Sequence, residues 1–165
     1  MSGRPANNSV EGTTLVVAAK RSCPPQWRAF MEALASTLSE IAGDELGLRV
    51  LAGVGAAIAK QQPVPSCNSL VDLKAAMNVT LAALDWGQVD IYEADKALEF
   101  VVVGYPYFEG VEAQTAFAAI LEALLEGWLG GQASRPGLAM HLVERGSGVY
   151  PPLVFRYERT SATQS

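Results

Sequence analysis

This chain of 165 residues contains a single histidine, so every catalytic scheme that needs a histidine base depends on that one side chain. His141 lies between Met140 and Leu142, in a stretch whose alternating apolar residues predict a β-strand. A Ser/His/Asp or Cys/His scheme needs a histidine base beside its nucleophile, so it would have to use this side chain. We expect instead a strand histidine that faces solvent or bonds to the backbone.

The two cysteines, Cys23 and Cys67, do not have the spacing of a metal site. Structural zinc sites pair cysteine and histidine over short intervals, and no such pair exists among Cys23, Cys67 and His141. Two cysteines are also too few for a disulfide framework, so we expect reduced, unpaired thiols. The sequence therefore predicts neither a metal nor a cofactor.

Two further patterns could be compared with known sites: a pair of glutamates with a glycosidase site, and a pair of glycines with a nucleotide-binding loop. Glu122 and Glu126 lie four residues apart on one predicted helix face, whereas a glycosidase holds its carboxyl groups on opposite sides of a bond. Gly53 and Gly55 resemble the start of a dinucleotide fingerprint, but no strand precedes them. We interpret the glutamates as solvated charge and the glycines as points of close approach by a neighbouring backbone. We expect no enzyme.

The apolar pattern predicts the elements that position these residues. Helical spacing covers residues 24–42, 45–61, 69–85 and 112–130, and strand patterns cover 89–92, 98–104, 138–145 and 153–159. Asp85-Trp86-Gly87 should close the third helix. The order predicts a single α+β domain, in which N-terminal helices and a later helix pack on a small antiparallel sheet.

The two ends of the chain differ in composition from its centre. Residues 1–22 are rich in Ser, Asn, Gly and Thr, which predicts a flexible N-terminal arm whose removal leaves the fold intact. Residues 160–165 predict a disordered tail, and residues 23–159 remain as the folded domain.

Charge and hydropathy argue against several classes of partner. A net charge of −5 and a pI near 4.9 offer no basic surface for nucleic acid or anionic membrane. No uncharged stretch approaches the roughly 20 residues that a membrane-spanning helix needs. The apolar piece at 15–19 is shorter than the apolar region of a signal peptide, and basic residues follow it instead of preceding it. We therefore expect no membrane insertion and no signal peptide.

A series of short motifs runs through the domain in a fixed order. They are FMEAL at 30–34, IAG at 41–43, GVG at 53–55, PSCN at 65–68, LDWG at 84–87, VDI at 89–91 and ILEALLEGW at 120–128. Over about residues 27–158, their order and spacing resemble the bacterial cellulose synthase D-subunit family, that of the cellulose synthase operon protein D.

This resemblance implies a component of cellulose-producing operons that makes no glycosidic bonds itself. Such a component helps to order new glucan chains, or the synthase complexes that extrude them. The resemblance also implies dimers that close into a ring, an octameric cylinder with N-terminal segments towards its inside. Expected partners are copies of the chain, other subunits of the cellulose synthase complex and glucan. The expected location is the cytoplasm near the inner membrane, with the periplasm as the alternative.

Aromatic rings stack on the apolar faces of glucose units, which makes aromatic side chains the candidate glucan or partner contacts. These candidates are Trp27, Tyr105, Tyr107 and Phe108. The broad apolar face of the helix over 112–130 provides the candidate oligomer interface, at Phe117, Ile120 and Leu124. Trp86 and Trp128 are assigned to the core.

The layout of the chain also resembles the family of four-vinyl-reductase-like sensor domains. In both, helices are followed by a glycine, here Gly104, then by a helix and two terminal strands. That alternative implies a domain that binds a small ligand in a tight apolar pocket.

Overall fold

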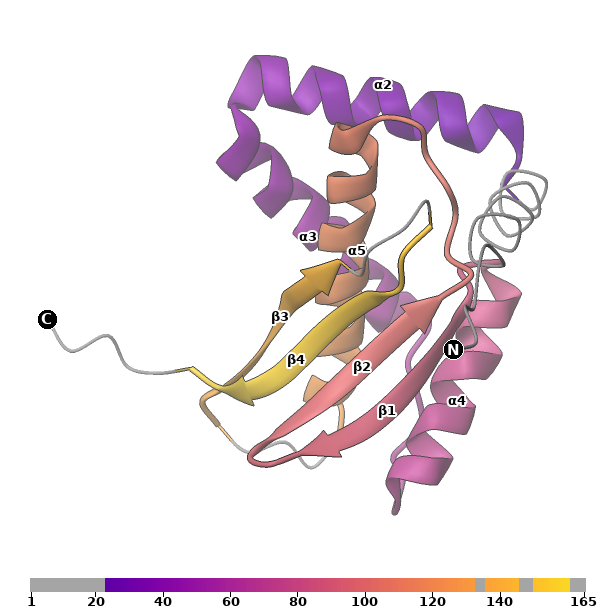
Figure 1. The fold of residues 1–165 in the computed structure, drawn as a ribbon, viewed down its shortest axis with the longest axis vertical. Helices are drawn as coiled ribbons and strands as arrows, with labels where there is room; N and C mark the ends of the chain where they lie inside the picture. Colours follow the sequence, from indigo (N-terminus) through magenta and orange to yellow (C-terminus); the bar gives the residue numbers. More distant parts are fainter. Residues whose placement is uncertain (1–22, 133–135, 146–149, 161–165) are drawn as a thin grey trace, which may run out of the picture.

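The computed structural model describes residues 23–132, 136–145 and 150–160. The expected arm at 1–22 and the tail after residue 160 lie outside these ranges. The expected order of helices and strands is confirmed, and the domain is α+β (Figure 1). The elements are α2 (Pro25–Ala42), α3 (Asp44–Gln61), α4 (Leu70–Ala83), β1 (Gln88–Ala94), β2 (Ala97–Val103), α5 (Val111–Gly130), β3 (Leu138–Arg145) and β4 (Leu153–Arg159).

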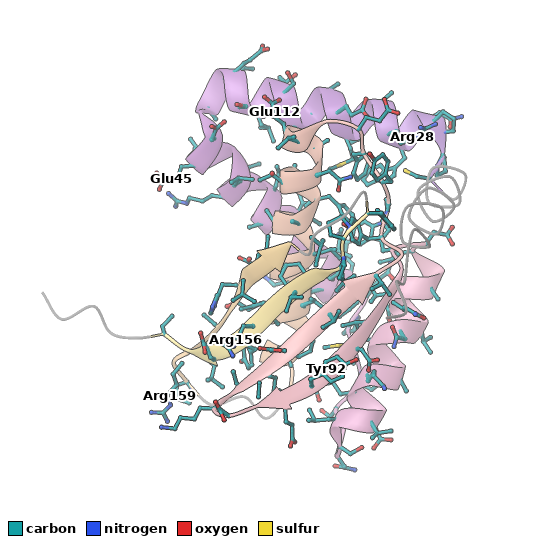
Figure 2. The ribbon with its side chains drawn as sticks, viewed as in Figure 1. Arg28, Glu45, Tyr92, Glu112, Arg156 and Arg159 are labelled. Carbon is teal, nitrogen blue, oxygen red and sulfur yellow. The ribbon has the colours of Figure 1, made fainter. Side chains whose placement is uncertain are left out.

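The four strands form one antiparallel sheet in the order β1-β2-β4-β3. Because side chains alternate along a strand, each strand presents an apolar face and a more polar face. Phe100 of β2 lies opposite Phe155 of β4, and both are fully buried. On the other face, Arg156 contacts Glu99 at 3.1 Å (Figure 2). The buried face lies against α5, which packs on β3 and β4, while α4 packs on β1 (Figure 1).

Helix α5 forms the centre of the core. Its buried residues face both α3 and the sheet, which explains why its sequence is apolar on nearly all sides. Trp86 packs edge-on against Phe117 with ring centroids 5.1 Å apart. The Trp128 indole nitrogen donates a hydrogen bond of 2.8 Å to the carbonyl of Gln62. The assignment of Trp86 and Trp128 to the core is confirmed.

Glycine allows α3 and α5 to come very close together. A Cβ added at Gly55 would lie 2.1 Å from the carbonyl oxygen of Ile120, so only glycine fits there. The close approach predicted for Gly55 is therefore confirmed. The same prediction for Gly53 is wrong, because a Cβ on this exposed residue would meet no atom within 4 Å. The two glycines lie two residues apart and thus on different sides of the helix.

The ends of α4 follow from local sequence. The Ser69 hydroxyl accepts a hydrogen bond of 3.1 Å from the amide of Asp72 and so caps the first turn. After the helix, Gly87 adopts a φ of +86°, and a Cβ there would lie 2.2 Å from the carbonyl oxygen of Val103. The helix ends within the predicted region, but the left-handed residue that follows its C-cap is Asp85, with a φ of +55°, and not Gly87. Gly87 instead lets the chain turn tightly against the end of β2.

Side chains from helices occupy one position on each edge strand. On β1, the Asn78 amide of α4 accepts from the Val89 amide at 2.7 Å and donates to the Val89 carbonyl at 2.9 Å. On β3, the carboxylate of Glu122 accepts from the amide of Leu142 at 2.8 Å. Unpaired strand edges attract other strands, so these contacts limit pairing of another strand at both positions.

Candidate functional site

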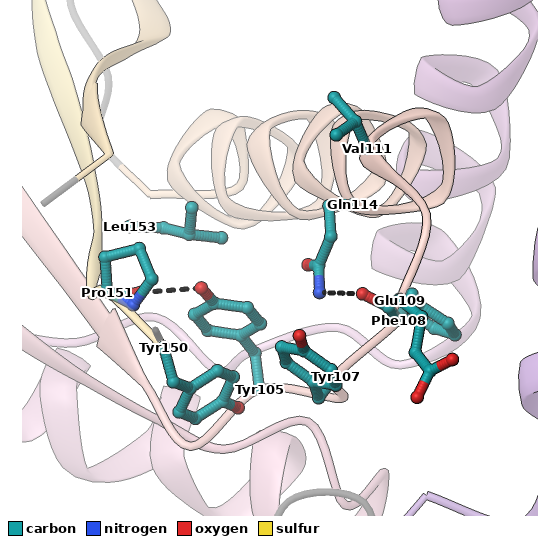
Figure 3. A pocket seen from close by; sticks show the side chains of 9 residues that line it. All are labelled: Tyr105, Tyr107, Phe108, Glu109, Val111, Gln114, Tyr150, Pro151 and Leu153. Atoms are coloured by element: carbon teal, nitrogen blue, oxygen red, sulfur yellow. Dashed lines mark hydrogen bonds between the residues drawn. The ribbon is translucent and has the colours of Figure 1, made fainter. Parts of the chain in front are cut away.

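The loop between β2 and α5 lines a surface cavity of about 180 Å³, which we call the aromatic pocket (Figure 3). Three parts of the chain build it: the loop itself, the start of α5, and the residues that lead into β4. Its lining consists of Tyr105, Tyr107, Phe108, Glu109, Val111, Gln114, Tyr150, Pro151 and Leu153. The fold thus brings together segments more than 40 residues apart.

Two hydrogen bonds hold the aromatic loop in place (Figure 3). The Tyr105 hydroxyl donates to the carbonyl of Pro151 at 2.6 Å, which ties the loop to the segment before β4. The Gln114 amide nitrogen donates to the carbonyl of Phe108 at 2.6 Å, which ties the loop to α5. Together these bonds fix both ends of the aromatic stretch against rigid elements.

The rings in the pocket differ in their exposure. Tyr105 and Phe108 are 3% and 1% exposed, so most of their surface belongs to the core. Tyr107 and Tyr150 are half-buried, and their rings meet edge to face with centroids 5.8 Å apart. Tyr107 and Tyr150 are therefore the tyrosines with the most ring surface to offer a ligand.

Tyr150 lines the pocket with its ring but keeps its hydroxyl buried. Its oxygen is buried and has no hydrogen-bond partner among the described residues. Burial is the main cause that raises the pKa of Tyr150, and the nearby Tyr105 and Cys23 add to it. The phenol therefore stays neutral, and its buried oxygen offers no accessible surface to a ligand.

The chemistry of the pocket suits binding better than acid–base catalysis. Its lining combines aromatic rings with phenol hydroxyls, one amide and one carboxylate, that of Glu109. A sugar presents apolar ring faces and hydroxyl groups, for which rings and polar side chains are the matching partners. The described residues of the lining include no histidine, cysteine or pair of carboxylates.

Trp27, the fourth aromatic candidate, lies in a different place. It is half-buried on α2 and stacks on Phe30 with centroids 5.9 Å apart. Together with Cys23 and Trp86, Trp27 lines a second surface cavity of about 280 Å³. The structure therefore groups Tyr105, Tyr107 and Phe108 but separates Trp27 from them.

The three candidate interface residues of α5 are enclosed by their own chain. Phe117 and Leu124 have no exposed surface, and Ile120 is 2% exposed. The broad apolar face of α5 is buried against α3 and the sheet. In the single chain these three side chains therefore offer almost no surface to another copy.

The residues considered for catalysis are dispersed. His141 is exposed on the face of the sheet away from α5, where its Nε2 lies 3.2 Å from the Glu158 carboxylate. The interpretation of Glu122 as solvated charge is wrong, because Glu122 is half-buried and bonds to the edge of β3. Burial raises the pKa of Glu122, and the hydrogen bond from Leu142 partly offsets this effect.

The cysteines and acidic residues form no grouped site within the described ranges. Cys23 is buried and Cys67 half-buried, and both are free thiols. Among the described residues, no three His, Cys, Asp or Glu side chains gather closely enough to hold a metal ion. No helix in this part of the chain has the length and apolar character that a membrane span requires.

The part of the chain that matches a known family includes all the residues that line the pocket. Residues 13–155 match the model of the family of cellulose synthase D subunits. The chain belongs to this family. A cellulose synthase operon protein D from Komagataeibacter xylinus is 31% identical over 117 residues, which cover 68% of this chain and 73% of that protein. A protein of the same name from Komagataeibacter sucrofermentans has the same identity and coverage.

Membership of the cellulose synthase D-subunit family confirms the resemblance drawn from the ordered motifs. It supports involvement of the chain in cellulose synthesis. The matched range, residues 13–155, contains α2, α3, α4, α5 and the aromatic loop. The pocket is thus part of the domain that defines the family.

Sequence patterns alone did not identify several members of the pocket, among them Gln114, Tyr150, Pro151 and Leu153. Gln114 lies on a predicted helix and Leu153 at the start of a predicted strand, so neither is distinguished by type. The cluster Tyr150-Pro151-Pro152 was a usable signal, because an aromatic residue beside two prolines is a stiff feature in a loop. Its proximity to Tyr105 depends on tertiary contact.

Proposed function

We propose that this chain is a non-catalytic scaffolding subunit of the cellulose synthesis and secretion machine. It assembles with copies of itself beside the synthase and promotes ordered export or crystallisation of glucan chains. The observation that carries the proposal is the match of residues 13–155 to the cellulose synthase D-subunit family. The lining of the aromatic pocket, which suits binding better than acid–base chemistry, supports it.

The proposed role is geometric. A processive sugar transferase needs groups that bind a sugar nucleotide and activate the acceptor hydroxyl. The sequence has no nucleotide-binding fingerprint, and its one histidine lies on the open face of the sheet. A scaffold instead changes the order of the product while bond formation continues.

Deletion of the gene distinguishes an effect on the order of the extruded cellulose from an effect on sugar transfer by the synthase. We expect membranes from a deletion strain to keep transferring labelled sugar from its nucleotide. The extruded cellulose should be less abundant or should diffract less sharply. The proposal fails if the sugar-transfer activity of the membranes vanishes and is restored by pure wild-type protein but not by a His141→Ala variant.

Self-assembly is part of the proposal. Several large apolar side chains are exposed on single chains, including Ile41 at 81% and Phe30 at 57%, and association would cover such surface. We expect dimers that combine into an octamer. Light scattering of pure protein at micromolar concentration tests this expectation, and a species of 17.5 kDa would contradict it.

Glucan contact is assigned to the aromatic pocket in this proposal. Cello-oligosaccharides should perturb the NMR signals of its residues, and Tyr107→Ala should weaken their binding, because Tyr107 offers a partly exposed ring. Trp27→Ala, in the second cavity, is the matched control. Equal binding by wild type and Tyr107→Ala would exclude the pocket. A copurifying apolar ligand in native mass spectra would favour a sensor domain instead.

The proposed location is the cytoplasm beside the inner membrane. Fractionation of cells against cytoplasmic and periplasmic markers tests it directly. Recovery of the protein with the periplasmic marker would support the alternative and would place its assembly on the export side.

A further inference from the structure

Helix α3 has an apolar face that the described chain leaves uncovered. Leu46, Val50 and Val54 follow each other at intervals of four residues and are 48%, 47% and 42% exposed. The opposite side of α3 is buried against α5 through Leu51, Gly55 and other residues. A helix at the surface of a single domain normally turns polar residues outward at such positions.

The exposed apolar face is continuous and free of charge. With 3.6 residues per turn, Gly53, Leu46, Ala57, Val50 and Val54 fall within a band about 100° wide around the helix axis. All five residues are exposed. The small residues Gly53 and Ala57 would let another helix approach closely. We call these five residues the α3 band.

Three charged residues lie on one flank of this band. Arg49 lies between Glu45, in the first turn of the helix, and Lys60, in the last turn. Glu45 and Lys60 have opposite signs and stand at the two ends of the helix, and all three residues are exposed. Figure 2 shows Glu45 projecting outward from the upper part of α3. Within the described part of the chain, neither Glu45 nor Lys60 forms an ion pair.

We propose that the α3 band packs against the α3 band of a second copy, with the two helices antiparallel about a two-fold axis near residues 52 and 53. This inference rests on the proposed function, because it names the surface through which the scaffold pairs. A two-fold interface must be complementary to itself. The antiparallel arrangement sets Val50 of one copy beside Val54 of the other, and Glu45 of each copy beside Lys60 of the other.

Charge favours the antiparallel arrangement over the parallel one. Antiparallel pairing brings opposite charges together at both ends and sets the positive end of each helix dipole beside the negative end of its partner. Parallel pairing would place Glu45 beside Glu45 and Lys60 beside Lys60. Like charges at such distances repel, so the residues at the ends of α3 select one orientation.

The exposed face of α4 lacks this complementarity. Val71 and Val79 are each 72% exposed, so α4 also has apolar surface. Its charged residues, Asp72 and Lys74, both lie in its first half, and its last turn carries no basic residue. Lys74 is already paired with Asp90 at 3.0 Å. An antiparallel pair of α4 helices would therefore gain no ion pair at its ends.

A charge-reversal cycle tests the proposed pair of helices. At low ionic strength, Glu45→Lys and Lys60→Glu should each weaken self-association by about 10-fold, because two ion pairs per dimer become repulsive. The double variant should recover association close to that of wild type. Dissociation constants come from analytical ultracentrifugation across a dilution series.

A second set of variants tests the apolar contact. Val50→Asp places two carboxylates near the two-fold axis, so the assembly should lose at least half of its mass in light scattering. Val79→Asp, on the equally apolar face of α4, is the matched control and should keep the wild-type mass. Circular dichroism confirms that each variant is folded. If Val50→Asp unfolds, the charge-reversal cycle still decides the question, since its residues are exposed.

The outcomes separate this inference from the proposed function. If wild-type protein is a monomer, self-assembly fails and the α3 pair fails with it. If wild type assembles but neither Val50→Asp nor the charge reversals change its mass or affinity, the α3 pair is excluded and the scaffold remains. Recovery by the double variant together with loss in Val50→Asp supports the α3 pair.

Discussion

Replacement of Gly55 by alanine tests the closest contact between α3 and α5. The added Cβ would lie 2.1 Å from the carbonyl oxygen of Ile120 and 3.0 Å from its carbonyl carbon. Both atoms belong to the backbone of α5, so neither can rotate away as a side chain would. The two helices would have to separate by roughly 1 Å before the contact became an ordinary one.

The size of the effect follows from two opposing contributions. Forcing an extra carbon into a close-packed contact costs about 1–3 kcal/mol, and more where a backbone has to move. Alanine stabilises a helix interior by about 1 kcal/mol relative to glycine. Because separation also loosens the neighbouring contacts of Leu51 and Ala59, we expect Gly55→Ala to lower the free energy of unfolding by about 2 kcal/mol. For a domain of this size, that corresponds to a fall of about 4–8 °C in melting temperature.

Gly53→Ala is the matched control on the same helix. A Cβ at Gly53 would meet no atom of its own chain within 4 Å, so within a single chain only the helix propensity of the residue changes. We expect this variant to raise the free energy of unfolding by about 0.5–1 kcal/mol. The two alanine variants should therefore shift stability in opposite directions.

Urea denaturation and thermal melting of both variants, at one fixed protomer concentration, measure these shifts. The experiment is repeated at tenfold lower concentration, because assembly stabilises the folded state and would add a concentration-dependent part. Equal stability of Gly55→Ala and Gly53→Ala at both concentrations would refute the packing argument.

Three further predictions concern single side chains. Asn78→Ala should lower the free energy of unfolding by about 1–3 kcal/mol, measured by urea denaturation, because Val89 loses both hydrogen-bond partners at the edge of β1. Burial raises the pKa of Glu122, so its carboxyl adds stability at low pH that is lost as the pH rises above 4.5 through the folded pKa. Glu122→Gln should flatten this part of the pH dependence of the unfolding free energy, whereas Glu126→Gln should reduce it only in part, because the charge of Glu126 is a smaller cause of the raised pKa than burial. Leu124→Asp should unfold the chain, seen as loss of the cooperative melting transition, because it buries a carboxylate at a cost of several kcal/mol.

Local patterns predicted the elements because helices and strands bury side chains with different periods. The stripe of Leu73, Met77 and Leu81 marks α4, and these residues are buried as the spacing indicates. The alternation of Leu153, Phe155 and Tyr157 marks β4 in the same way. The same patterns indicated the α+β class and the order of motifs that characterises the family.

Patterns could not show which apolar surface remains exposed. Phe117 and Leu124 were candidate interface residues because α5 is apolar on nearly all sides, yet the fold covers every side of it. Among the described helices, exposed large apolar side chains lie instead on α2, on one band of α3, on α4 and at the first residue of α5. A periodic pattern shows that a face avoids water, but it does not show whether the cover comes from the same chain.

The sequence by itself determined the helices, the strands, the position of the turn at Gly87 and the family to which the chain belongs. Each depends on residues close together in the chain or on a fixed order of motifs. Tertiary structure alone decided that Gly55 but not Gly53 meets a backbone, that Glu122 bonds to a strand edge, and that Tyr150 joins the aromatic loop. These features depend on distances between distant segments, which the packing of α5 against α3 and the sheet determines.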